Sequence, residues 1–92
     1  MKPAITNLEF AAGMQANDPG VWRLLAIAYG RDGQLAMSAL AQAEQAMAAG
    51  NKKEARLQAR RAQKGLPSGS PAWMQADAII SAAGGPDGDD DE

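Results

Sequence analysis

Residues 17–30 read NDPGVWRLLAIAYG and contain the signals that start an amphipathic helix. Asn17 and Asp18 are of the residue types that cap helices, and Pro19 follows at a first-turn position where proline is favoured. Apolar side chains then recur at spacings of three and four residues, at Trp22, Leu25, Ala26 and Tyr29. The pattern predicts a helix from Pro19 to the break at Asp32-Gly33.

Similar breaks divide the rest of the chain into helical segments. Gly50-Asn51 forms one break, a loop follows Gly65, and Ser70-Pro71 repeats the combination of a cap and a proline. We predict an all-α fold of about five helices. Besides the helix that starts at Pro19, these cover roughly residues 3–16, 34–49, 52–64 and 71–84. Connections of only a few residues make consecutive helices antiparallel neighbours.

Length and composition favour the same fold class. A chain of 92 residues forms at most one small domain, which we place over residues 1–83. The chain has 21 alanines but only one Phe, one Tyr and two Trp. Alanine favours helices packed at short distances, whereas sheets favour branched and aromatic residues. Residues 84–92 combine glycine and proline with five acidic residues, and are predicted to be a disordered acidic tail.

The breaks are regularly spaced. Gly33 and Gly50 lie 17 residues apart, and Asn17 lies 16 residues before Gly33. Trp22 and Trp73 are separated by 51 residues, which is three such intervals. Half of a repeat of about 34 residues has this length, so the spacing predicts antiparallel helical hairpins stacked as an α-solenoid.

These positions resemble the tetratricopeptide repeat. The pattern Trp22-x2-Leu25-Ala26-x2-Tyr29 is similar to its first-helix motif, with alanine where glycine is usual. Its second-helix motif is resembled by Gly50-x4-Ala55-x3-Ala59-x2-Ala62-x4-Pro67, and again by Ala4-x3-Leu8-x2-Ala11. The resemblance implies a short solenoid that starts in the middle of a repeat and acts as a protein-interaction module.

A narrower resemblance covers about residues 3–80. Residues 17–30, 50–62 and 66–73 together are similar to the C-terminal repeat tail of proteobacterial zinc metallopeptidases, the group that includes the β-barrel assembly-enhancing protease. The zinc-binding His-Glu-x-x-His of that group has no counterpart here, so no catalytic residue is transferred. The resemblance implies a non-catalytic role in the periplasm, holding protein substrates or partners near a protease. The chain has no targeting signal, so a cytoplasmic location stays open.

Candidate binding residues lie on a second face of the helix that starts at Pro19. The first helix of each repeat lines the concave surface in the related family, which implies a groove for a peptide or an unfolded segment. On this helix the face contains Arg23, Ile27, Gly30 and Arg31. The next helix adds Glu44 and Met47, with Leu40 and Met37 on the same face. The arginines would pair with carboxylates of a protein partner. The alternatives are a solvated face for the arginines and ordinary core packing for Met47.

Aromatic residues and the uncovered first helix allow two further interpretations. Trp22, Tyr29 and Trp73 are assigned to the core, and the alternative is a set of aromatic rings that stack on a ligand. The first helix lacks its hairpin partner, so Ile5, Leu8 and Phe10 are candidates for a partly uncovered apolar face. Such a face predicts self-association or contact with a preceding domain.

A basic stripe runs along the helix over residues 52–64. Lys52, Arg56, Arg60 and Lys64 repeat every four residues, and this stripe could bind nucleic acid or an anionic surface. We favour a solvated convex face, because no aromatic side chains lie between the bases.

Besides a protein-interaction module and a binder of nucleic acid or an anionic surface, a third possible function is that of a structural cap. Such a cap closes a longer solenoid without a ligand of its own.

Catalysis is the function that the composition disfavours most. The chain has neither His nor Cys, so common zinc ligands, a thiol nucleophile and an imidazole base are excluded. No cofactor or metal site is predicted, and the chain is not expected to be an enzyme. No apolar run approaches the roughly 18 residues of a membrane-spanning helix.

Overall fold

The computed structural model describes residues 2–84, which form five helices and no strand. The helices are α1 (Lys2–Met14), α2 (Pro19–Arg31), α3 (Leu35–Ala48), α4 (Lys52–Lys64) and α5 (Pro71–Ala82). The predicted all-α class and the number of helices are therefore confirmed. Nearly all of the predicted acidic tail, residues 85–92, lies outside the described residues.

Local signals account for where the helices begin. Three of them start with a side-chain cap: Asp18 accepts a hydrogen bond from the Gly20 N–H at 2.9 Å, Asn51 from the Glu54 N–H at 3.2 Å, and Ser70 from the Trp73 N–H at 3.2 Å. Pro19 and Pro71 are the first residues of α2 and α5.

The turns before and after α3 need glycine. Gly33 has a φ of 80° and Gly50 a φ of 82°, which lie in the left-handed region that other residues rarely adopt. Each glycine therefore reverses the chain within a few residues, and the next helix runs back along the previous one.

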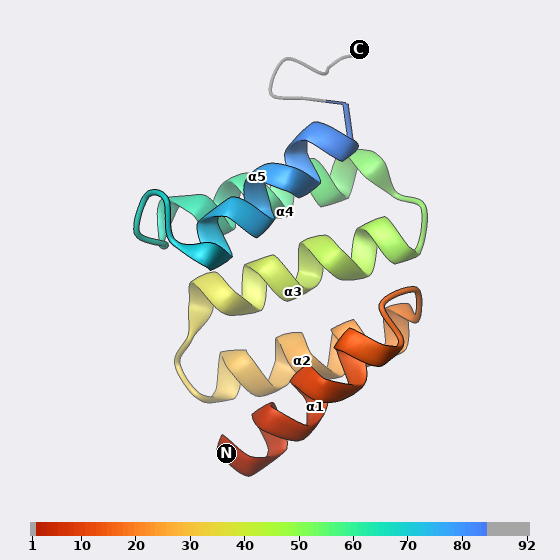
Figure 1. Ribbon diagram of the computed structural model, residues 1–92, viewed down its shortest axis with the longest axis vertical. Helices are drawn as coiled ribbons and strands as arrows, with labels where there is room; N and C mark the ends of the chain where they lie inside the picture. The colour runs from red at the N-terminus through yellow and green to blue at the C-terminus, as the bar shows by residue number, and fades with distance from the viewer. Residues whose placement is uncertain (1, 85–92) are drawn as a thin grey trace.

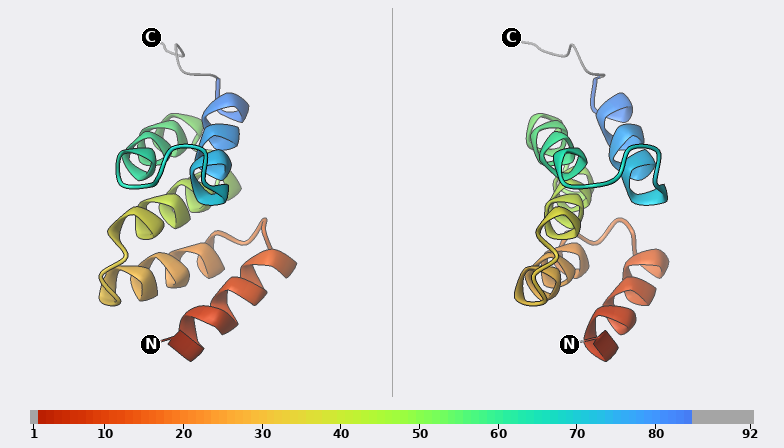
Figure 2. Two further views of the ribbon diagram at one scale, coloured as in Figure 1. Left: turned by 60° about the vertical axis from the view of Figure 1, so that its left-hand side comes forward. Right: turned by 90° about the vertical axis from the view of Figure 1, so that its left-hand side faces the viewer.

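The five helices form an array in which each helix packs on the next along the chain. Figures 1 and 2 show α2, α3 and α4 side by side in one layer, with α1 and α5 on the same face of that layer. The helix α5 also contacts α3. The backbone of α1 lies close to α2 and to no other helix within residues 2–84. This order of contacts is consistent with a helical repeat.

Alanine lets the central helices approach closely. Ala43 of α3 and three alanines of α4, Ala55, Ala59 and Ala62, have no exposed surface. Gly65, just after α4, lies so near α3 that an added Cβ would come 2.9 Å from the Cβ of Ala36. Ser38 is also buried, and its hydroxyl donates a hydrogen bond of 2.8 Å to the carbonyl of Ala26 in α2. Close backbone packing therefore joins α2, α3 and α4.

The exposed side of α1 carries large apolar residues. Phe10 is 72% and Met14 is 70% exposed, whereas Ile5 is buried and Leu8 is half-buried against the core formed with α2. Of the three candidates for an uncovered face, Phe10 is exposed and Ile5 is not. Self-association stays a prediction.

Among residues 2–84, no helix has the length and apolarity to span a membrane.

Candidate functional site

A hollow of about 300 Å³ opens between α1 and α5, with α2 and α3 as its floor. The helices α1 and α5 stand on the same face of the layer, α1 against α2 and α5 against α4 and α3, and the hollow lies between them (Figure 2). The lining residues are Glu9, Ala12, Gly13, Trp22, Leu25, Tyr29, Met37, Leu40, Ala41, Glu44 and Gln75.

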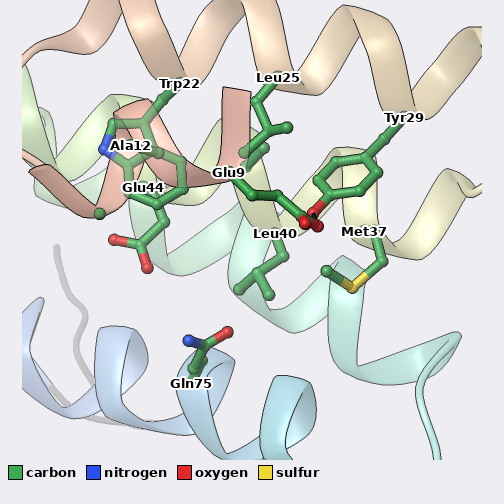
Figure 3. A pocket seen from close by; sticks show the side chains of 11 residues that line it. Glu9, Ala12, Trp22, Leu25, Tyr29, Met37, Leu40, Glu44 and Gln75 are labelled. Carbon is green, nitrogen blue, oxygen red and sulfur yellow. Dashed lines mark hydrogen bonds between the residues drawn. The ribbon is translucent and has the colours of Figure 1, made fainter. Parts of the chain in front are cut away.

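Apolar side chains form the floor of the hollow. On α2, Trp22, Leu25 and Tyr29 follow at helical spacing and project from one face. Met37 and Leu40 of α3 continue this surface (Figure 3). The indole N–H of Trp22 donates a hydrogen bond of 2.8 Å to the carbonyl of Ala16. Since this bond fixes the indole's polar edge, the rest of the ring is left to contact the hollow.

A hydrogen bond joins the side chains of Tyr29 and Glu9 at the edge of the hollow. The Tyr29 hydroxyl donates to Oε2 of Glu9, which ties α2 to α1 (Figure 3). Burial, and then the hydrogen bond and the charge of Glu9, raise the pKa of Tyr29 well above its ordinary value. The hydroxyl therefore stays protonated and keeps donating at neutral pH.

Glu44 projects from α3 into the hollow. Figure 3 shows its carboxylate between the ring of Trp22 and the amide of Gln75. Burial raises the pKa of Glu44 above its ordinary value. Within residues 2–84 this carboxylate has no hydrogen-bond or ion-pair partner. A half-buried charge without a partner is costly in free energy, so Glu44 is the polar group of the hollow that most needs a ligand.

Replacement of Glu44 with glutamine tests this cost. At neutral pH the variant is expected to have the higher free energy of unfolding, because an amide is cheaper to bury than a carboxylate. The folded chain binds its proton more tightly than the unfolded chain, so the wild type loses stability as the pH rises from the unfolded pKa through the raised, folded one. The advantage of the variant should therefore grow between about pH 3 and pH 7 in thermal unfolding measurements. A variant that is less stable at neutral pH would contradict the placement of Glu44.

The predicted groove residues fall into different places. Glu44 lines the hollow, and so do Met37 and Leu40. Met47 packs against the buried cluster of α3, α4 and α5, as its core alternative stated. Arg23, Ile27 and Arg31 are exposed and Gly30 is half-buried, and none of these four belongs to the lining. Their role in binding a partner stays a prediction, but the structure does not bring them together with Glu44 in the hollow.

Eight of the eleven lining residues are not among the predicted groove residues, whereas Met37, Leu40 and Glu44 are. Trp22 and Tyr29, which the sequence predicts in the core, do contact it, yet they also form the floor of the hollow. Periodicity showed that these side chains share a face. It contains no information on whether a neighbouring helix covers that face completely. One alternative from the sequence does point to this part of the lining. It is the set of aromatic rings that stack on a ligand, and it includes Trp22 and Tyr29.

The basic stripe on α4 is partly engaged within the fold. Arg56 donates a hydrogen bond of 2.6 Å to the carbonyl of Ala83, which holds the end of α5 against α4. Arg61 donates to Gln58 at 3.4 Å on its own helix. Lys52, Arg60 and Lys64 are exposed. Arg56 is therefore bound within the fold. The role of the basic stripe as a binding surface stays a prediction.

No metal site is evident in the described part of the chain. Residues 2–84 contain no group of three or more carboxylate, His or Cys side chains placed to hold a metal ion.

In comparisons with protein-family models, curated proteins and solved structures, nothing matches this chain. The tetratricopeptide and metallopeptidase resemblances therefore rest on the sequence motifs alone.

Proposed function

We propose that this chain is a protein-interaction module of the tetratricopeptide type, and that it binds a peptide or an unfolded segment in the hollow between α1 and α5. The observation that carries the proposal is the lining of this hollow, which is apolar across α2 and α3 and has the polar groups of Glu9, Glu44 and Gln75 around it. Binding sites generally combine an apolar floor with a few polar groups in this way.

The size of the hollow suits side chains of a peptide. Its volume of about 300 Å³ is at the lower end of the range for ligand sites. This space accepts one or two large side chains, while the backbone of the peptide runs along the open mouth between α1 and α5. The same volume is small for a folded element such as a helix.

The metallopeptidase resemblance supports a more specific role. We propose that the module is a non-catalytic part that holds substrates or partners for a periplasmic zinc metallopeptidase. A reading frame that joins this sequence to a zinc-binding His-Glu-x-x-His domain would support this role. The proposal for peptide binding does not depend on it.

Fluorescence titration tests the site directly. In a Trp73→Phe variant, Trp22 is the remaining tryptophan, and it lines the hollow. We expect members of a panel of short peptides to change the emission of Trp22 in a saturable manner. A double variant with Arg23→Ala and Arg31→Ala serves as the control, because both arginines lie outside the lining. It should bind the same peptides unchanged.

Two results would contradict the proposed site. If no peptide in a chemically varied panel alters the emission of Trp22, the hollow does not bind peptides. If binding is lost in the double arginine variant, the partner occupies the exposed face of α2 that contains Arg23 and Arg31, and the hollow is not the site.

A further inference from the structure

We propose that the hollow selects a positively charged side chain, Lys or Arg, from the bound peptide, with its charge beside Glu44 and its aliphatic stem on the apolar floor. This inference rests on the proposed function and names the chemistry of its ligand. It is opposite in sign to the sequence-based expectation, in which Arg23 and Arg31 pair with carboxylates of the partner.

Charge is the first argument. The lining contains two carboxylates, Glu9 and Glu44, and neither Lys nor Arg. One oxygen of Glu9 already accepts the hydrogen bond from Tyr29, whereas Glu44 has no partner within residues 2–84. An acidic side chain would be repelled here, and a neutral one would bury the Glu44 charge further without compensation. A cation supplies the missing partner.

Geometry is the second argument. The carboxylate of Glu44 points into the space between the ring of Trp22 and the amide of Gln75 (Figure 3). An aromatic ring attracts a cation placed over its face, and tryptophan does so most strongly. The amide oxygen of Gln75 is able to accept a hydrogen bond from the same group. Side chains from α2, α3 and α5 thus line the part of the hollow into which the Glu44 carboxylate projects, and their chemistry suits a guanidinium or ammonium group there.

The apolar floor sets the length of the ligand. Leu25, Met37 and Leu40 contribute apolar side chains to the lining and offer no hydrogen bond to a small ion. Lys and Arg bury an aliphatic stem while they place the charge at its end, which matches an apolar floor beside a single carboxylate. A metal ion fits poorly, because residues 2–84 hold no group of three ligating side chains.

The experiment compares peptides that differ at one position. Peptides with Arg, Lys, Gln or Glu at the centre of the same apolar sequence are titrated into the full chain carrying Trp73→Phe, and Trp22 emission is recorded. We expect the Arg and Lys peptides to bind about tenfold more tightly than the Gln peptide, and the Glu peptide to bind most weakly. In Glu44→Gln, the preference for Arg over Gln should disappear, and the Gln peptide should bind at least as tightly as it does to the wild type, because no charge is then buried beneath it.

An acid outside the hollow provides the matched control. Asp77 on α5 is exposed and does not belong to the lining, so Asp77→Asn removes the same charge elsewhere. This variant should keep the preference for cationic peptides. Equal losses in Glu44→Gln and Asp77→Asn would show attraction by net charge alone and would overturn the inference.

Failure of the inference and failure of the proposed function give different results. If the Arg and Gln peptides bind equally and saturably, the hollow is a peptide site but does not select a cation. If none of the four peptides changes Trp22 emission, the proposed function itself is wrong. Circular dichroism of each variant before titration verifies that it is folded.

Discussion

Replacement of Leu25 with alanine is expected to lower the free energy of unfolding by about 2–5 kcal/mol. Leu25 is 2% exposed, and it packs in the cluster that joins α1, α2 and α3 under the hollow. The shorter side chain removes apolar contacts and leaves a space that the surrounding alanines are too small to fill. For a chain of this length, whose total stability is on the order of 5–14 kcal/mol, the loss is a large fraction.

The neighbouring leucine is the control for this prediction. Leu24 is 49% exposed on the same helix, so Leu24→Ala should change the free energy of unfolding by less than about 1 kcal/mol. Both values come from urea unfolding followed by circular dichroism, with the slope of the transition compared between variants. Similar losses for the two variants would mean that Leu25 is not the buried member of the pair.

Replacement of Ala59 with leucine is expected to destabilise the fold by about 1–3 kcal/mol or more. Ala59 has no exposed surface and lies between Ala55 and Ala62 in the buried cluster that α4 forms with α3 and α5. The larger side chain fits only if α4 moves away from the helices packed against it. Such a movement also weakens the contacts of the neighbouring alanines, so the cost exceeds that of one misplaced side chain.

An exposed alanine isolates the effect of packing. Ala78 lies on the solvent side of α5, and Ala78→Leu adds the same atoms to a helix without a neighbour to displace. Its melting temperature should stay close to that of the wild type, while that of Ala59→Leu should fall by several degrees, about 4–8 °C for each kcal/mol. Equal melting temperatures would contradict the close approach of α3 and α4.

The helices were largely predictable because their signals are local. Pro19 and Pro71 begin helices as predicted, and Gly33 and Gly50 end the turns around α3 with positive φ values. Helical hydrogen bonds, caps and turn conformations depend on residues only a few positions apart. Composition contributed as well, since a chain rich in alanine forms the close helix contacts seen at Ala55, Ala59 and Ala62.

The candidate site was predictable only in part. Glu44 was chosen from the sequence and does line the hollow, but Met47 lies against the core. The expectation that Arg23 and Arg31 line the concave surface came from the family resemblance. In the structure, the hollow lies instead against the face of α2 that carries Trp22 and Tyr29. Helical periodicity identifies an apolar face without showing how far its neighbours cover it.

The sequence alone determines five short helices joined by short turns. Each helix depends mainly on residues that are close to one another along the chain. The hollow is a different kind of property. Glu9, Glu44 and Gln75 belong to three helices, and they meet around one space because α1 and α5 pack on the same face of the layer. That arrangement depends on which side chains interdigitate between helices. These side chains lie far apart in the sequence, so the spacing of residues along one helix does not predict which of them meet.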